Sequence, residues 1–260
     1  MAAGALAVAS SLAIAAGGYQ VKSESETIPE MSSGGITIKC PQGSSAVGGG
    51  FFLDGDNSRK VNGAFPSSQR KFVVTGSNSD GTGTFDLVGK AVCDDDGDFG
   101  IVDNDVPVDS GTTEAVKARC PDGTTVSGGG FRVQGPDLAI RSSYPAGSRK
   151  WAVSAQNGGL TTVTLKAFAI CDRDGNAYTV ERKTKAPPPT PKARGINADV
   201  TLEPKCKGGL EPSGGGFKSK GFGSLRAVRS VPDGDSWSVE LATYAGKPLQ
   251  LSGYAVCGAG

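Results

Sequence analysis

Apolar and polar residues alternate in three short runs of the chain, which is the pattern of a half-buried β-strand. The runs span residues 71–75, 151–155 and 237–241, and each has an aromatic residue at its first or second position. Similar extended runs come shortly before three of the cysteines, at 36–39, 115–119 and 200–202. No segment after residue 20 has a helical period of useful length, so the pattern predicts an all-β fold.

The clearest predicted strands are three segments that each end on a cysteine. In 87–93, 165–171 and 251–257, every second position is a leucine, a small residue or the cysteine itself. Side chains alternate along a strand, so these small residues and the cysteine share one face, which can pack closely against another backbone. The opposite face is also apolar in all three segments, which predicts a strand with a neighbour on each side.

These segments belong to an internal repeat that occurs three times. Each copy opens on a cysteine, and Gly-Gly-Gly-Phe begins eight residues later. A proline follows at 25 or 26 residues from the cysteine, then an aromatic residue five or six positions on, and a second cysteine closes the copy. The glycine triplets are residues 48–50, 128–130 and 214–216, and the aromatic residues are Phe72, Trp151 and Trp237. A triplet could form a phosphate-binding loop, but no helix and no Lys-Ser/Thr follows it. The structural interpretation is therefore favoured, in which the glycines allow a bulge or close sheet packing.

The repeat suggests how the six cysteines pair. A pairing that repeats with the unit gives three disulfides, Cys40–Cys93, Cys120–Cys171 and Cys206–Cys257. Each would close a loop of roughly 50 residues, for which the chain-entropy estimate is roughly 4 kcal/mol. The competing interpretation is a metal cluster, but the chain has neither a C-x-x-C pair nor a histidine.

The sequence therefore predicts an all-β protein of three homologous, disulfide-stapled units, each with four or five strands. We expect them to form a pseudo-threefold, β-prism-like arrangement, because units of this size bury little surface alone. The alternative is that the third unit forms a separate bead beyond a proline-rich linker. The expected segments are 1–18 (signal-peptide-like), 19–35 (polar), 36–93 (first repeat), 94–119 (acidic connector with a hairpin), 120–171 (second repeat), 172–205 (basic, proline-rich linker) and 206–260 (third repeat).

The N-terminal segment predicts export. Residues 2–18 are apolar and small, and residues 13–15 form the A-x-A pattern of a cleavage site, although no lysine or arginine precedes them. The alternatives are an Ala/Gly-rich tail or a weak membrane helix. Disulfides also require an oxidising compartment. We expect a secreted or cell-surface protein with no stable membrane span in the mature form.

Composition narrows the candidate chemistry. The chain has no histidine, which excludes Ser-His-Asp and Cys-His nucleophile systems and HExxH zinc sites. Its 27 basic and 26 acidic residues leave a formal charge of +1, so no global field attracts nucleic acid or an anionic membrane. We expect no nucleic-acid partner, no cofactor and no enzymatic activity.

Two sets of residues are candidate binding sites. Phe72, Trp151 and Trp237 could stack on sugars or bases, or they could anchor the core of each unit. Carboxylates after the first two units could bind Ca²⁺, or they could be solvated residues of Asp-Gly hairpin turns whose returning strands are 99–102 and 178–181. The candidate Ca²⁺ ligands are Asp94, Asp96, Asp98, Asp172 and Asp174. Their spacing does not fit an EF-hand.

The phrase Cys-Pro-x-Gly, Gly-Gly-Gly-Phe, Trp-x-Val and an apolar stretch ending on cysteine resembles repeats in poorly characterised exported bacterial proteins. It is carried by residues 120–171 and more loosely by the other two units, where Phe72 replaces Trp and Lys207 replaces Pro. The resemblance implies an exported β-repeat and no assigned activity. Three glycine-rich β units are also similar, more distantly, to the β-prism of vitelline membrane outer layer proteins, which implies a carbohydrate-associated role.

The leading hypothesis is an exported, non-enzymatic protein that binds or decorates the cell envelope or an extracellular polysaccharide, because repeated units multiply weak contacts. One alternative is a secreted, carboxylate-dependent enzyme that acts on glycans. The other is a purely structural or adhesive extracellular protein.

Overall fold

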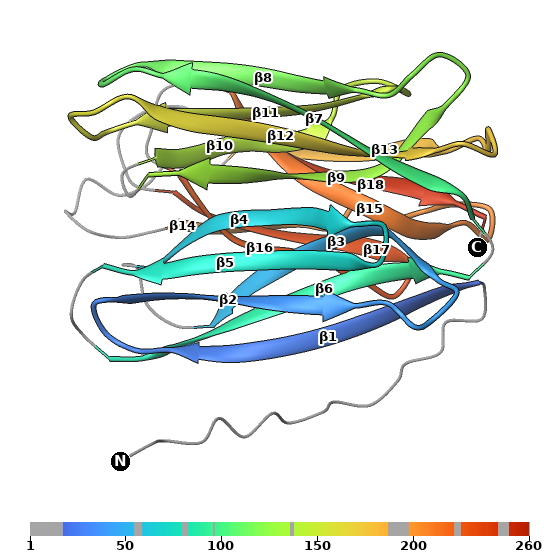
Figure 1. Ribbon diagram of the computed structural model, residues 1–260, viewed down its shortest axis with the longest axis horizontal. Helices are drawn as coiled ribbons and strands as arrows, with labels where there is room; N and C mark the ends of the chain where they lie inside the picture. Colours follow the sequence, from blue (N-terminus) through green and yellow to red (C-terminus); the bar gives the residue numbers. More distant parts are fainter. Residues whose placement is uncertain are drawn as a thin grey trace.

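The computed structural model describes residues 18–54, 59–79, 83–95, 97–135, 138–186, 198–220, 225–243 and 250–259. These residues form eighteen β-strands and no helix (Figure 1). No described segment is therefore a helix that could cross a membrane. The signal-peptide-like segment lies outside the described residues apart from its last position, and the proline-rich run at 187–191 lies outside them entirely.

The strands divide into three units of six. The predicted repeats themselves hold four or five strands each, as expected, and the remaining strands lie in the segments expected as polar or connecting. Unit 1 contains β1 (Tyr19–Ile28), β2 (Ser32–Lys39), β3 (Ser45–Asp54), β4 (Arg59–Ser68), β5 (Lys71–Asn78) and β6 (Phe85–Asp94). Unit 2 contains β7 (Phe99–Val108), β8 (Thr113–Arg119), β9 (Thr125–Gln134), β10 (Leu138–Pro145), β11 (Lys150–Asn157) and β12 (Val163–Asp172). Unit 3 contains β13 (Thr179–Lys185), β14 (Ala198–Leu202), β15 (Glu211–Lys220), β16 (Leu225–Asp233), β17 (Ser236–Thr243) and β18 (Gln250–Gly258).

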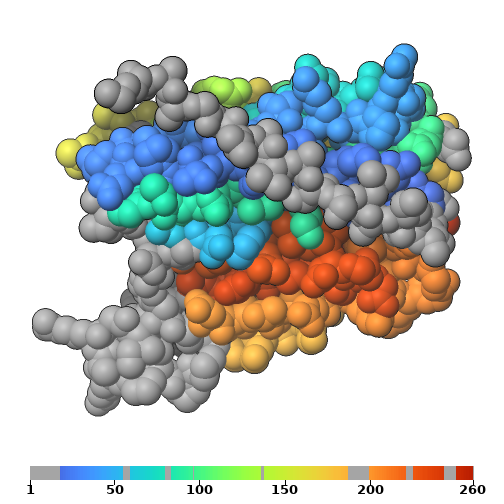
Figure 2. Space-filling model, turned by 90° about the horizontal axis from the view of Figure 1, so that it is seen from below, coloured from blue at the N-terminus to red at the C-terminus, as the bar shows by residue number. Residues whose placement is uncertain are grey.

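Each of the three sheets combines three strands from one unit with three from another. Sheet A has the order β1-β6-β3-β16-β17-β14, sheet B the order β2-β5-β4-β9-β12-β7, and sheet C the order β13-β18-β15-β10-β11-β8. Figure 2 shows one result of this sharing, with strands from the start of the chain, blue to cyan, beside strands from its end, orange to red. The third unit is thus not a separate bead, because β15 pairs with β10 and β16 pairs with β3.

Within a unit, the two half-sheets are joined by the disulfide. Cys40 follows β2 in sheet B and bonds to Cys93 of β6 in sheet A, with the Cα atoms 5.6 Å apart. Cys120–Cys171 and Cys206–Cys257 form the same connection in the other units, at 5.6 and 5.7 Å. All three predicted disulfides are confirmed, and each ties together two different sheets.

The predicted strands that close each repeat are confirmed as internal strands, and this explains why the predicted hairpins are wrong. β6 is paired on one side with β1 and on the other with β3, so it has no free edge for a returning strand. After the acidic turn, β7 instead joins sheet B, where it pairs with β12. β13 likewise pairs with β18 rather than with β12. The segments expected as connectors thus contain the first strands of the following units.

The glycine triplets allow backbones from different units to touch. The first glycines of the three triplets pack against one another: a β-carbon on Gly48 would lie 3.0 Å from Gly214 Cα, one on Gly214 2.8 Å from Gly128 Cα, and one on Gly128 2.9 Å from Gly48 Cα. The third glycines leave room for carbonyl oxygens of the neighbouring unit, with Gly50 against Ser230, Gly130 against Ala64 and Gly216 against Ser143. Each triplet also lies at a register shift in its strand. The structural interpretation of the triplets, close sheet packing, is therefore confirmed.

Candidate functional site

The repeated aromatic residues lie in the core, which corrects their assignment as ligand-binding residues. Trp151 is 1% exposed, and Trp237 and Phe72 are 0% exposed. Each ring covers the second glycine of its own triplet, so that a β-carbon on Gly49, Gly129 or Gly215 would overlap the ring. An aromatic ring recurs because every unit has the same space to fill above the second glycine of its triplet.

A polar partner accompanies each tryptophan and is missing beside the phenylalanine. The indole Nε1 atoms donate hydrogen bonds of 2.9 Å to serine hydroxyls, Trp151 to Ser143 and Trp237 to Ser230. In unit 1 the residue two positions before the repeated proline, where these serines lie, is Ala64. Phe72 has no donor that would need a partner there. The two positions vary together because a buried N–H without an acceptor is costly.

The candidate Ca²⁺ ligands do not assemble a cation site in the part of the chain that the structure describes, where no three acidic, Cys or His residues are grouped to hold a metal. Asp96 lies outside the described residues. Asp172 is fully buried, and its carboxylate accepts hydrogen bonds from the Asp174 backbone N–H, Asn176 Nδ2 and Tyr178 OH, at 2.8, 3.0 and 2.7 Å. Asp174 in turn accepts from the Asp98 backbone N–H at 2.9 Å, and Asp94 is half-buried opposite Tyr19. Asp172 and Asp174 are therefore structural acceptors.

Two tyrosines beside Asp172 join the beginning of the described chain to its end. Tyr19 donates to the Ala259 carbonyl at 3.4 Å, and Tyr178 lies beside it. Burial raises the pKa of Tyr19 from its usual 10.0 to about 12. Burial, with Tyr19 and Asp172 as neighbours, also raises the pKa of Tyr178 well above its usual value. Both hydroxyls therefore stay protonated and serve to hold this end of the molecule together.

The outward surface of sheet C carries a different aromatic pair. The rings of Tyr144 on β10 and Tyr254 on β18 stack with centroids 5.2 Å apart and an interplanar angle of 29°. Lys218 Nζ lies over the Tyr144 ring at 4.6 Å, and Arg182 Cζ lies over the Tyr254 ring at 5.7 Å. Arg182 Nε and Nη2 also donate to Ser252 Oγ at 3.2 and 3.1 Å. The pair forms a cation-flanked aromatic surface across the junction of units 2 and 3.

Further cations surround this pair. Residues that pair across strands share a face, and the register of sheet C places Lys117 opposite Ala152, which is opposite Tyr144. By the same register, we define the basic face as Lys117, Arg119, Lys150, Arg182, Lys218 and Lys220 around Tyr144 and Tyr254. Among the described residues, none of these six cations has a carboxylate within ion-pair distance. Arg141 lies on the same face and donates to Gln156 at 3.5 Å.

The equivalent surfaces of the other two sheets differ around the positions of the tyrosine pair. On sheet B, Phe65 and Phe168 stack at 5.1 Å, but the neighbouring Lys166 pairs with Asp103 at 3.2 Å and Asp105 at 3.9 Å. On sheet A, Val231 and Lys90 replace the two aromatic residues. The outward register of sheet A carries the carboxylates Asp54, Asp86, Asp199, Asp233 and Glu240, which we define as the acidic face. The same register also carries Lys90 and Arg229, and Arg229 pairs with Glu240 at 3.7 Å. The formal charge of +1 therefore conceals a strong separation of charge between faces.

No protein-family model matches the chain, and no curated protein matches it either. The roles of the basic face therefore rest on its geometry. Alternation along 251–257 puts Tyr254 on the face opposite Cys257, but this pattern does not connect it with Tyr144. The available signal was the residue before the repeated proline, which is Phe65, Tyr144 or Val231 in the three units.

Proposed function

We propose that the protein is an exported, non-enzymatic protein that binds an acidic polysaccharide of the cell envelope or extracellular matrix through the basic face of sheet C. The observation that carries the proposal is the absence of ion-paired carboxylates around six cations that flank a stacked tyrosine pair within the described residues. The three disulfides fit an oxidising setting outside the cytosol.

The chemistry of the basic face suits a flexible acidic chain. Lysine and arginine attract the carboxylates or sulfates of such a chain, and the tyrosine hydroxyls can donate or accept hydrogen bonds with sugar hydroxyls. Tyr144 is half-buried and Tyr254 is 7% exposed, so the rings are too covered to stack on a sugar. Their role is to pack against the side chains of Lys218 and Arg182 and hold these cations in place. Several weak contacts along one polymer add up through effective concentration.

We also propose that the three units form a β-prism-like body around a pseudo-threefold axis. The sharing of sheets supports this arrangement, because it runs once around the three units: unit 1 shares a sheet with unit 3, unit 3 with unit 2, and unit 2 with unit 1. The mutual packing of Gly48, Gly128 and Gly214 fits contact at such an axis. This arrangement would turn the outer faces of the three sheets in different directions, so that the basic face could act alone.

The test compares the affinity of the folded protein for a soluble uronic-acid polymer with that for a neutral glucan. We expect binding to the acidic polymer only, weakening steeply as salt rises because bound counterions are released. The double variant Lys117→Ser/Lys218→Ser should reduce the affinity at least about tenfold, which corresponds to about 1.4 kcal/mol. The matched control Lys22→Ser/Lys60→Ser removes the same charge away from the basic face and should bind as the native protein does.

Other outcomes would replace the proposal. Equal affinity for the neutral glucan would show that charge does not drive the binding. Tighter binding of single-stranded DNA than of the uronic-acid polymer would indicate a nucleic-acid partner. Shortening of the polymer during incubation would favour the glycan-active enzyme, and absence of binding to any polymer would favour a purely structural or adhesive protein.

A further inference from the structure

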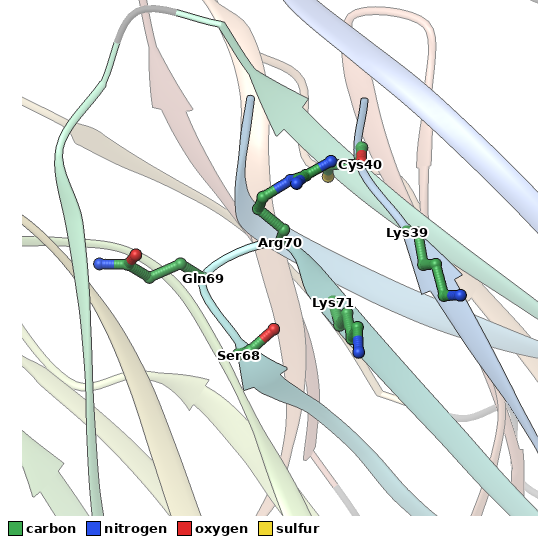
Figure 3. Close-up of a pocket in the computed structure, with 6 residues that line it drawn as sticks. All are labelled: Lys39, Cys40, Ser68, Gln69, Arg70 and Lys71. Carbon is green, nitrogen blue, oxygen red and sulfur yellow. Dashed lines mark hydrogen bonds between the residues drawn. The ribbon is translucent and has the colours of Figure 1, made fainter. Parts of the chain in front are cut away.

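A pocket of about 340 Å³ lies in unit 1 beside the Cys40–Cys93 disulfide, on sheet B rather than on sheet C. It is lined by Lys39, Cys40, Ser68, Gln69, Arg70 and Lys71 (Figure 3). Lys39 ends β2 and Lys71 begins β5, and their side chains extend in the same direction. The turn between β4 and β5 is fixed by a hydrogen bond from Gln69 Nε2 to the Phe99 carbonyl at 2.9 Å. The pocket is thus built on a constrained turn.

The pocket brings like charges together. Lys39 and Lys71 are direct cross-strand partners in the β2–β5 register, an arrangement that is destabilising unless something lies between the charges. In unit 2 the equivalent pair, Arg119 and Lys150, also carries like charges, but it has a carboxylate nearby, because Arg119 helps to lower the pKa of Asp122. In unit 3 the equivalent pair is Lys205 and Ser236, and Lys205 is neutralised by Asp235 at 2.6 Å. In the described part of unit 1, neither lysine has a carboxylate within ion-pair distance.

Arg70 of unit 1 also differs from its equivalent in unit 2, because it has no ion pair among the described residues. Its Nε and Nη2 atoms donate to the Pro41 and Cys40 carbonyls, both at 3.2 Å, which hold the guanidinium at the rim of the pocket without neutralising it. The equivalent Arg149 of unit 2 also bonds to a backbone carbonyl, but it forms an ion pair with Asp122. That hydrogen bond and ion pair lower the pKa of Asp122 below its usual value.

Unit 1 has Gln42 at the position of Asp122, two residues after the opening cysteine. Asp95, a carboxylate next to the closing strand of unit 1, accepts hydrogen bonds from Ser44 Oγ and Gln20 Nε2, at 2.5 and 3.2 Å. Each of these contacts directs the acid to a neutral partner. Among the described residues, the three cations of the pocket therefore have no ion-pair partner.

We propose that this pocket binds a compact oxyanion of charge −2, a phosphate or sulfate group, between the ammonium groups of Lys39 and Lys71 with Arg70 at its edge. A doubly charged tetrahedral anion relieves the repulsion between the two lysines and accepts charge-assisted hydrogen bonds from both. The group is either a free ion or the headgroup of a larger molecule. The site lies on sheet B and does not depend on polysaccharide binding by sheet C.

The experiment titrates the full folded chain with inorganic phosphate at low ionic strength and follows backbone amide chemical shifts. We expect saturable shifts confined to residues 39–45 and 68–71. Gln42→Asp supplies the carboxylate that unit 2 places beside Arg149, and Lys71→Ser copies unit 3; each should weaken phosphate binding by about fivefold or more. The control Lys60→Ser removes one charge from the same sheet outside the pocket and should leave the affinity unchanged.

Vesicles that contain a phosphate-monoester lipid form a second arm of the test. Binding to the vesicles that Gln42→Asp removes would assign the group to a headgroup, whereas phosphate binding without vesicle binding would assign it to a free ion. Shifts that spread evenly over all exposed lysines, or that Gln42→Asp and Lys71→Ser leave unchanged, would overturn the proposal. Gln42 and Lys71 are exposed and Lys60 is partly exposed, so an unchanged melting temperature would show that the variants keep the fold. Retained uronic-acid binding in these variants would keep the two sites distinct.

Discussion

Sheets A and C are built from equivalent strands, yet their outward surfaces carry opposite charge. The acidic face of sheet A carries Asp54 at the position of Lys220, and it has Val231 and Lys90 at the positions of the tyrosine pair. Their inward surfaces, in contrast, carry the same small residues, disulfides and buried aromatic residues. The repetition of the interior is thus explained by packing alone, and specific binding is to be sought where the units differ.

The largest effect expected for the interior comes from a glycine at a junction between units. In Gly50→Ala the new methyl group would overlap the Ser230 carbonyl of unit 3, and neither backbone can move without breaking the β3–β16 pairing. We expect a loss of at least about 4 kcal/mol in unfolding free energy, measured by urea denaturation. The control Gly76→Ala lies within a sheet, 3.1 Å from the Lys60 carbonyl and near the mobile end of Leu87, and should cost much less. Equal losses would show that the junction is not special.

The disulfides should contribute nearly equally in the three units, because each closes a loop of 51 to 53 residues. Replacing Cys120 and Cys171 with alanine should cost about 4 kcal/mol in the chain-entropy model, and so should the equivalent change in unit 1 or 3. The measurement is chemical denaturation of the three double variants. A much smaller loss in one unit would mean that its two half-sheets hold together without the bridge.

The tyrosines that join the two ends of the described chain predict a loss of stability at high pH. A tyrosine whose pKa is about 12 in the fold and 10.0 in the unfolded chain contributes fully below pH 10. This contribution to the unfolding free energy is lost as pH rises through about 12, and it amounts to at most about 3 kcal/mol for Tyr19. Tyr19→Phe should flatten the dependence of unfolding free energy on pH above 10. An unchanged alkaline slope in this variant would place the titration elsewhere.

The smallest effect tests why tryptophan occurs with serine and phenylalanine with alanine. Ser143→Ala leaves the buried Trp151 N–H without its acceptor and should cost about 1–2 kcal/mol. Adding Trp151→Phe, which copies the pair found in unit 1, should recover part of that loss. Unfolding free energies of the two single variants and the double variant complete the cycle. Simple additivity would show that the hydrogen bond does not couple the two positions.

Local patterns in the sequence predicted the strands and the three disulfides, because alternation and spacing are properties of contiguous residues. They could not predict which strands share a sheet. The turn at 94–98 contains a good hairpin signal, but both edges of β6 are occupied by β1 and β3, so the chain crosses to sheet B. The basic face was missed for the same reason: Tyr144 and Tyr254 are 110 residues apart in the chain and meet only because units 2 and 3 share a sheet.

Lysine footprinting tests most directly whether the basic face of sheet C is the binding surface. The protein is acetylated with and without the uronic-acid polymer, and the modification of each lysine is read by mass spectrometry. We expect protection of Lys117, Lys150, Lys218 and Lys220 on the basic face, with Lys22 and Lys60 unaffected. Protection spread equally over all six lysines, or confined to Lys22 and Lys60, would contradict this expectation.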